Sequence, residues 1–212
     1  MEVLHRIRDG GVIAVLRGID EETLLPMAEA LVDGGITALE VTADTKGAAG
    51  MVEELDASID APGTVIGAGT VLDGPTARRM IAAGAEFVLT PTLKPEVVET
   101  ANRYGITVIP GVFTPSEAQR AYEVGADAIK LFPAKSGGPG HLSAIRGPLE
   151  QVEIIPTGGI SLENGEAYLE AGAFALGVGS ALLTDEILDN RDWTALEQRA
   201  SEYTALVEAA RE

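Results

Sequence analysis

The stretch Gly125-Ala126-Asp127-Ala128-Ile129-Lys130-Leu131 places a glycine just before a short apolar run that is typical of a buried strand. Similar glycine-led runs occur at residues 34–40, 84–89 and 172–177. Each glycine lies where a preceding helix should end, because glycine readily adopts the backbone conformation of a helix C-cap. The runs recur at roughly every second strand–helix unit, so the repeat predicts an alternating α/β chain.

Working outward from these runs, eight candidate strands alternate with amphipathic segments. The strands are expected at residues 12–17, 38–42, 64–68, 87–90, 107–109, 128–132, 153–156 and 173–178. Helices are expected between them, as at residues 22–33, 75–83, 95–104 and 115–124. This order predicts an α/β protein, a (β/α)8 TIM barrel, as a single domain over residues 1–212 with an N-terminal helical extension. A doubly wound sheet is the alternative, but the first strand lacks the Gly-x-Gly-x-x-Gly turn of a dinucleotide site.

The composition is that of a globular and strongly acidic protein. Hydrophobic residues make up 46% of the chain, the formal net charge is −18, and there is no cysteine. The negative electrostatic potential of such a chain repels nucleic acid and anionic membranes, which argues against either as a partner. The lack of cysteine excludes disulfides and a cysteine nucleophile. No segment resembles a signal peptide or a membrane span, so we expect a cytoplasmic protein.

Lys130 is the residue that most directly predicts chemistry. It is one of only four lysines, and it stands in the middle of an apolar strand. Burial favours the neutral form of an amine. A neutral lysine amine is a nucleophile that forms a Schiff base with a carbonyl substrate. The structural alternative is that Lys130 lies at a strand end and extends its amine to water.

Strand alternation brings two further side chains toward Lys130. Leu39 and Val41 share the outer face of their strand, so Glu40 should point inward, as should Lys130. Glu40 then serves either as a general acid/base or as an ion-pair partner for Lys130. Arg17 closes the first strand, where its planar guanidinium suits either a substrate carboxylate or a structural ion pair.

Two glycine-rich turns follow the last two strands. They are Thr157-Gly158-Gly159-Ile160 and Gly177-Val178-Gly179-Ser180. Backbone N–H groups in such turns bind phosphate, and barrels often bind phosphate after their seventh and eighth strands. The only histidines, His5 and His141, belong to no ligand spacing, so neither a metal site nor a cofactor is expected.

Six motifs occur in order along the chain. They are Val-Ile-Ala-Val-Leu-Arg-Gly (12–18), Leu-Glu-Val-Thr (39–42), Gly-Ala-Gly-Thr-Val-Leu (67–72), Lys-Leu-Phe-Pro-Ala (130–134), Pro-Thr-Gly-Gly-Ile (156–160) and Gly-Val-Gly-Ser (177–180). Together they closely resemble the 2-keto-3-deoxy-6-phosphogluconate aldolases, which are grouped with the 4-hydroxy-2-oxoglutarate aldolases. The resemblance implies a homotrimeric class I aldolase of the Entner–Doudoroff pathway. Such an enzyme splits the phosphorylated keto acid into pyruvate and glyceraldehyde 3-phosphate.

The resemblance also implies roles for individual residues. Lys130 is similar to the Schiff-base lysine, Glu40 to the general acid/base, Thr70 and Pro91 to pyruvate-pocket residues, Gly158, Gly159, Gly179 and Ser180 to the phosphate site, and Thr157 to a threonine near the substrate's C4 hydroxyl. Some family members hold the substrate carboxylate with an arginine in the loop after the second strand. Here Asp44 occupies that position. Arg17 or Lys46 would then bind the carboxylate.

Three other functions remain open. One is an aldolase acting on the galactonate epimer or on unphosphorylated 4-hydroxy-2-oxoglutarate, against which Thr157 and the phosphate turns argue. The second is a non-catalytic phosphosugar-binding barrel, which would have no need for an inward Lys130. The third is a phosphate-binding isomerase or epimerase, which would need a second acid/base in place of the imine.

The acidity itself predicts adaptation to high salt. The chain has 33 acidic and 15 basic residues, so self-repulsion should destabilise the folded state in dilute buffer. The screening length is about 10 Å at about 0.1 M salt and about 3 Å at about 1 M. The melting temperature and the activity should therefore rise into the molar range of KCl and NaCl alike. If both are already maximal in dilute buffer, the acidity has another cause.

Overall fold

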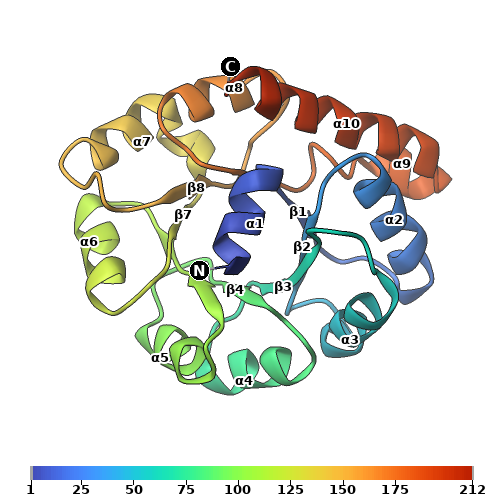
Figure 1. The fold of residues 1–212 in the computed structure, drawn as a ribbon, viewed down its shortest axis with the longest axis horizontal. Coiled ribbons are helices and arrows are strands. Elements are labelled where there is room, and N and C mark those ends of the chain that lie inside the picture. Colours follow the sequence, from blue (N-terminus) through green and yellow to red (C-terminus); the bar gives the residue numbers. More distant parts are fainter. Residues whose placement is uncertain (1, 212) are drawn as a thin grey trace.

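Parallel strands and helices alternate along the chain (Figure 1). The computed structural model describes residues 2–211. The strands are β1 (Val12–Leu16), β2 (Ala38–Thr42), β3 (Val65–Gly69), β4 (Phe87–Leu89), β5 (Thr107–Ile109), β6 (Gly111–Val112), β7 (Ile129–Leu131), β8 (Ile154–Pro156) and β9 (Leu176–Val178). The helices are α1 (Glu2–Gly10), α2 (Glu21–Asp33), α3 (Ala48–Ser58), α4 (Gly74–Ala82), α5 (Pro95–Tyr104), α6 (Pro115–Glu123), α7 (Gly138–Arg146), α8 (Gly165–Glu170), α9 (Asp185–Asn190) and α10 (Trp193–Ala209), and a 3-10 turn, η1 (Ala134–Ser136), follows β7.

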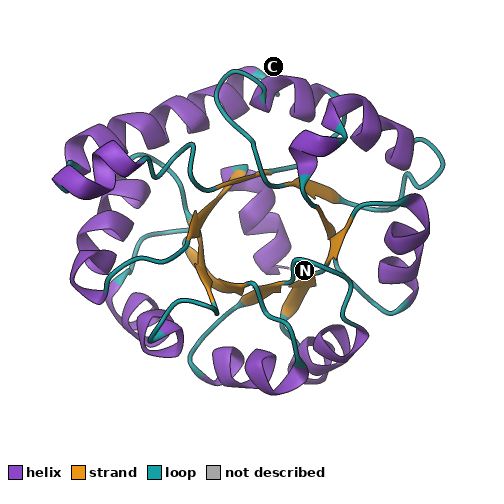
Figure 2. Cartoon of the chain, turned by 180° about the vertical axis from the view of Figure 1, so that it is seen from behind, coloured by secondary structure: helices purple, strands orange, loops and turns teal. Residues whose placement is uncertain are grey.

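The strands form two parallel sheets that curl around a common centre. Six strands join in the order β5-β4-β3-β2-β1-β9, and three join in the order β6-β7-β8. Only Pro110 separates β5 from β6, and an isolated parallel bridge between Thr157 and Gly177 links the end of β8 to β9. Figure 2 shows the strands in a ring, with α1 across the ring and the other helices outside it. The predicted parallel α/β architecture is confirmed.

Helix α1 is the predicted N-terminal extension, and it covers the end of the ring where the strands begin. Ile7 is fully buried in the cluster of inward-facing strand residues. Arg6 pairs with Glu86 at 2.6 Å, just before β4, and Arg8 pairs with Glu153 at 2.8 Å, just before β8. The opposite end of the ring, where the parallel strands stop, is not covered by α1 and is left for a functional site.

No helix within residues 2–211 combines the length and apolar composition needed to cross a membrane.

The two faces of β2 divide as the alternation predicts. Leu39 and Val41 belong to the outer cluster that packs against the helices. Ala38 belongs to the inner cluster, and Glu40 is fully buried beside Lys130 of β7. All five residues of β1 are buried because both of its faces are covered, which explains its unbroken apolar sequence.

The observed strands are shorter than the predicted ones at several ends. β7 stops at Leu131 and β9 starts at Leu176, whereas the apolar pattern predicts 128–132 and 173–178. Arg17 likewise follows β1 and is not part of it. The cause is that burial extends beyond the hydrogen-bonded ladder: Ala128 and Ala175 are buried although neither belongs to a strand. Helix α5 has the predicted bounds, and α6 ends one residue earlier than predicted.

Candidate active site

The residues at the carboxyl ends of the strands surround one cavity of about 360 Å³. Its lining includes seven of the residues predicted for the site: Arg17, Lys130, Thr157, Gly158, Gly159, Gly179 and Ser180. Lys130 belongs to β7, and the other six follow β1, β8 and β9. The fold therefore brings the predicted amine, guanidinium and glycine turns to one place.

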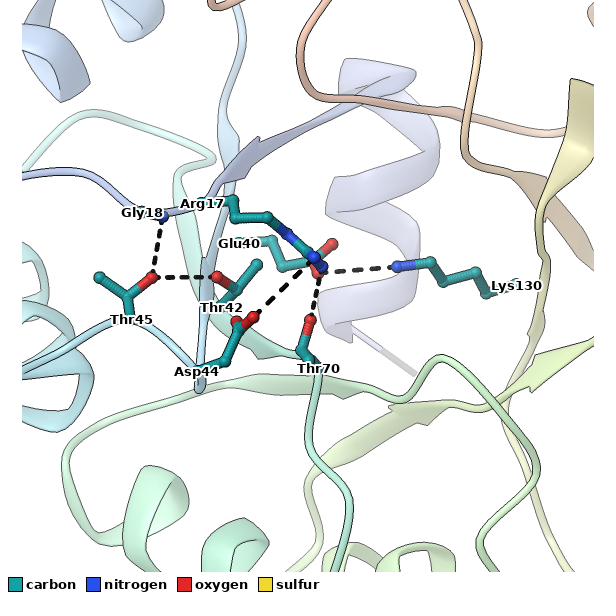
Figure 3. Close-up of polar contacts among 8 residues, drawn as sticks. All are labelled: Arg17, Gly18, Glu40, Thr42, Asp44, Thr45, Thr70 and Lys130. Carbon is teal, nitrogen blue, oxygen red and sulfur yellow. Dashed lines mark hydrogen bonds and ion pairs between the residues drawn. The ribbon is translucent and has the colours of Figure 1, made fainter.

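Lys130 and Glu40 form a buried pair at the centre of this region (Figure 3). Nζ of Lys130 lies 3.7 Å from Oε1 of Glu40, and the two side chains are 5% and 0% exposed. This distance is too long for a hydrogen bond. Among the described residues, neither carboxylate oxygen of Glu40 has a hydrogen-bond partner. Burying an unpaired acceptor is costly, so Glu40 holds open lone pairs for a ligand or water next to the amine.

Two glycines of β3 leave room for neighbouring side chains, Gly69 for Glu40 and Gly67 for Phe87. A Cβ atom at Gly69 would overlap Oε1 of Glu40. A Cβ atom at Gly67 would overlap the ring of Phe87. Gly69 therefore leaves room for the carboxylate.

Arg17 lies at the rim of the cavity and connects three loops (Figure 3). Its Nη2 donates to Oγ1 of Thr70 at 2.9 Å, and its Nη1 lies 3.9 Å from Oδ2 of Asp44. Nearby, the amide of Gly18 donates to Oγ1 of Thr45 at 3.1 Å. The side chains of Arg17 and Asp44 are 58% and 50% exposed, so their ion pair contributes little to stability. A guanidinium has five N–H donors, which leaves several for a carboxylate ligand.

Three residues predicted for the pyruvate end do not line the cavity. Thr70 reaches the rim only through its bond to Arg17. Pro91 packs against Gly111, where a Cβ atom would overlap the Pro91 carbonyl group. Lys46 is exposed and makes no ion pair within residues 2–211. The structure therefore brings Arg17 to the cavity, but not Pro91 or Lys46.

The turn after β8 leaves two successive backbone N–H groups, those of Gly159 and Ile160, without a hydrogen-bond acceptor among the described residues. Its carbonyl oxygens all accept from outside the cavity: Thr157 from Ala134 N (2.8 Å), Gly158 from Lys135 N (3.0 Å) and Gly159 from Asn164 Nδ2 (2.9 Å). In a trans peptide the N–H points opposite to the preceding carbonyl. The amides of Gly159 and Ile160 donate to no acceptor among the described residues, whereas the Gly158 amide is directed toward β9, where Thr157 bridges to Gly177. Positive φ angles of 90° and 83° at Gly158 and Gly159 explain the two glycines.

The turn after β9 adds two more unpaired amides. The carbonyl of Gly179 accepts from Leu182 N at 2.8 Å and from Leu183 N at 2.9 Å. Within the described chain, the amides of Ser180 and Ala181 have no acceptor, and both residues line the cavity. Clusters of backbone N–H groups are anion-binding concavities. The cavity thus has unpaired backbone amides at one end, which are donors suited to an anion, as well as a buried amine.

Several lining residues were not predicted as site residues. They are Val15, Phe132, Ile160, Ala181, Leu183, Asp185 and Leu188. Phe132 had a signal, because it shares the inward face of its segment with Lys130, whose Nζ lies 5.4 Å from the ring centroid. No pattern in the sequence indicated Asp185, because α9 was not predicted.

Within residues 2–211, no three His, Cys, Asp or Glu side chains group together as metal ligands would.

Comparisons with known proteins agree with this geometry. The family model described as KDPG and KHG aldolase matches residues 3–199. A 2-dehydro-3-deoxy-phosphogluconate aldolase of Pseudomonas aeruginosa is 39% identical over 92% of this chain and 88% of its own length. A 2-dehydro-3-deoxy-6-phosphogalactonate aldolase of Escherichia coli is 33% identical over 95% of each chain.

A solved structure of the KDPG aldolase of Legionella pneumophila superposes on this one with a TM-score of 0.87. The two are 34% identical, and the match covers 96% of this chain and 98% of that one. The Legionella structure contains pyruvate captured as a covalent carbinolamine intermediate. The family model and the relatives each span most of the sequence, and the chain therefore belongs to the KDPG and KHG aldolase family.

Proposed function

We propose that this protein is a class I aldolase that cleaves 2-keto-3-deoxy-6-phosphogluconate into pyruvate and glyceraldehyde 3-phosphate. One observation carries the proposal: the buried Lys130 amine lies 3.7 Å from a carboxylate whose oxygens have no hydrogen-bond partner among the described residues. The names of the relatives support the substrate class.

Lys130 is the nucleophile in this mechanism. Its neutral Nζ attacks the C2 ketone of the substrate, and loss of water leaves an iminium. As the C3–C4 bond breaks, its electrons pass to the iminium and form an enamine, and the C4 oxygen becomes the aldehyde carbonyl. Glyceraldehyde 3-phosphate leaves. The enamine then gains a proton at C3, and water adds to release pyruvate and the free amine.

Glu40 moves the protons in these steps. It removes the C4 hydroxyl proton, directly or through a water molecule, as the carbon–carbon bond breaks. Its two unpaired oxygens and its proximity to Nζ support this role. Thr157 is the candidate partner for the C4 hydroxyl. Its buried Oγ1 has no hydrogen-bond partner among the described residues, and Thr157 lines the cavity with Lys130.

The two anionic ends of the substrate are bound differently in this proposal. Arg17 binds the carboxylate, because it lines the cavity whereas Lys46 does not. The phosphate binds to the two clusters of unpaired backbone amides, with Ser180 beside them. These clusters favour a phosphorylated substrate over 4-hydroxy-2-oxoglutarate. Thr157 favours the gluconate over the galactonate epimer. Direct kinetic comparison of the two epimers decides between them.

We also propose that the fold is one complete (β/α)8 barrel over residues 1–212. The single residue between β5 and β6 supports counting them as one barrel strand, and the Thr157–Gly177 bridge supports closure between β8 and β9. A cytoplasmic homotrimer is proposed from the family resemblance alone. A non-catalytic phosphosugar-binding barrel is disfavoured because it has no use for a buried lysine beside an unpaired carboxylate.

Borohydride trapping tests the nucleophile. Pyruvate plus borohydride should inactivate the enzyme irreversibly and add the mass of reduced pyruvate to Lys130, as peptide mass spectrometry would measure. Lys130→Arg should be inactive and should not be trapped, because a guanidinium stays charged and forms no imine. An adduct on Lys135, or on no lysine, would refute the mechanism.

Steady-state kinetics test the role of Glu40. Glu40→Gln keeps the shape that fits against Gly69, yet kcat should fall roughly 10²–10⁴-fold, the usual loss for a general acid/base. Trapping by pyruvate should suffer much less. Gly69→Ala should reproduce this loss by displacing the carboxylate, whereas Gly50→Ala, which has open space around its Cβ position, is the matched control. A kcat near wild type in Glu40→Gln would leave Glu40 as a structural partner only.

The role of Arg17 can be tested by measuring the pyruvate concentration at which borohydride trapping reaches half of its maximum. Arg17→Ala should raise it roughly 10- to 100-fold, since a hydrogen bond to a charged group contributes about 1.5–3 kcal/mol. Lys46→Ala should leave it unchanged. The reverse result would assign the substrate carboxylate to Lys46.

A further inference from the structure

Asn164 supports the turn after β8, whose unpaired amides at Gly159 and Ile160 form the first amide cluster. Its Oδ1 accepts from the amide of Ser161 at 2.9 Å, and its Nδ2 donates to the carbonyl of Gly159 at 2.9 Å. One side chain therefore ties both ends of the segment 159–161. Asn164 does not line the cavity. Because the Gly159 carbonyl is directed to Asn164, the Ile160 amide on the same peptide plane is directed the opposite way.

Arg199 supports the turn after β9, whose unpaired amides at Ser180 and Ala181 form the second amide cluster. It stands on α10, and its Nε donates to the carbonyl of Ala181 at 2.6 Å. The other side of that peptide is the amide of Leu182, which closes the turn onto the Gly179 carbonyl at 2.8 Å. Arg199 also lies outside the cavity lining, and it adds a positive charge behind the turn.

We propose that Asn164 and Arg199 are positioning residues for a phosphate dianion. They touch no substrate atom. They fix the two turns with the carbonyls outward, so that the amides of 159–160 and 180–181 form the anion site before any ligand arrives. Without these ties the peptide planes could rotate, and binding would include the cost of ordering them. The identity of the phosphorylated ligand rests on the proposed function, whereas the affinity for phosphate itself does not.

Equilibrium titration with inorganic phosphate, followed by calorimetry or ³¹P NMR at constant KCl, tests this proposal. Asn164→Ala and Arg199→Met should each weaken phosphate binding about 3- to 10-fold, the effect of losing one ordinary hydrogen bond. Arg199→Lys, which keeps a charge and a donor, should restore most of the affinity. With the phosphorylated keto acid, KM should rise by a similar factor while kcat changes little.

Matched variants separate positioning from general stability. Asn102→Ala removes an equivalent bond, from Nδ2 to the carbonyl of Gly125 at 3.0 Å, at the other end of the strands. Arg211→Met removes the bonds from a guanidinium to the carbonyls of Arg8, Asp9 (2.8 Å) and Phe174 (3.5 Å), again away from the cavity. Both should leave phosphate affinity unchanged, and pyruvate trapping should be normal in all variants.

Unchanged phosphate affinity in both Asn164→Ala and Arg199→Met would overturn the proposal. So would an equal weakening of pyruvate trapping, which would indicate a general structural defect. Failure of the proposed function is read separately: a wild-type enzyme that pyruvate and borohydride do not trap would refute the aldolase mechanism and leave the phosphate titrations intact.

Discussion

The burial of an amine beside a carboxylate is the constraint on which the rest of this structure depends. Lys130 and Glu40 lie on β7 and β2, in the two different sheets, and they stay 3.7 Å apart without a hydrogen bond. Removing such groups from water is costly, so each must be held by packing and not by their mutual attraction. The outer cluster packs β2 against the helices, Gly69 leaves the carboxylate its space, and α1 closes the far end of the ring. Lys130 lines the cavity, and the fully buried Glu40 carboxylate lies 3.7 Å from its amine.

The proposed phosphate site relies on backbone amides and not on cationic side chains, although the chain is strongly acidic. The chain has a net charge of −18 and only four lysines, so few flexible lysine side chains are available to bind a phosphate. In the proposed site four backbone amides are the donors instead, and those of Gly159, Ile160 and Ser180 are oriented by hydrogen bonds to the carbonyl on the other side of the same peptide. Such short contacts do not depend on long-range attraction, which salt screens within a few ångströms at molar concentration. Phosphate recognition built on peptide geometry is therefore less sensitive to ionic strength than recognition by exposed lysines.

Much of the site could be predicted because the strand period is two. That period placed Glu40 and Lys130 inward, and the structure brings them together. The same rule would have found Phe132, two residues after Lys130. Pro91 is different: it follows a predicted strand, but its main chain lies against Gly111 and it does not line the cavity, and the sequence alone does not indicate this placement. Asn164, Asp185 and Arg199 could not be predicted, because their positions depend on how α8, α9 and α10 pack on the sheets.

The carboxylate end follows a different logic from the phosphate end. Arg17 is half exposed and is shared between Thr70 at 2.9 Å and Asp44 at 3.9 Å. A substrate carboxylate that binds Arg17 must therefore sit near Asp44, and the two like charges repel. Because Asp44 is exposed, salt screens this repulsion together with the attraction to Arg17. In molar salt the affinity of Arg17 for the substrate carboxylate then depends mainly on direct hydrogen bonds from the guanidinium. In the proposed mechanism the phosphate turns and the covalent bond to Lys130 supply the remaining affinity, so weak binding of the carboxylate by Arg17 is compatible with an enzyme that must also release pyruvate.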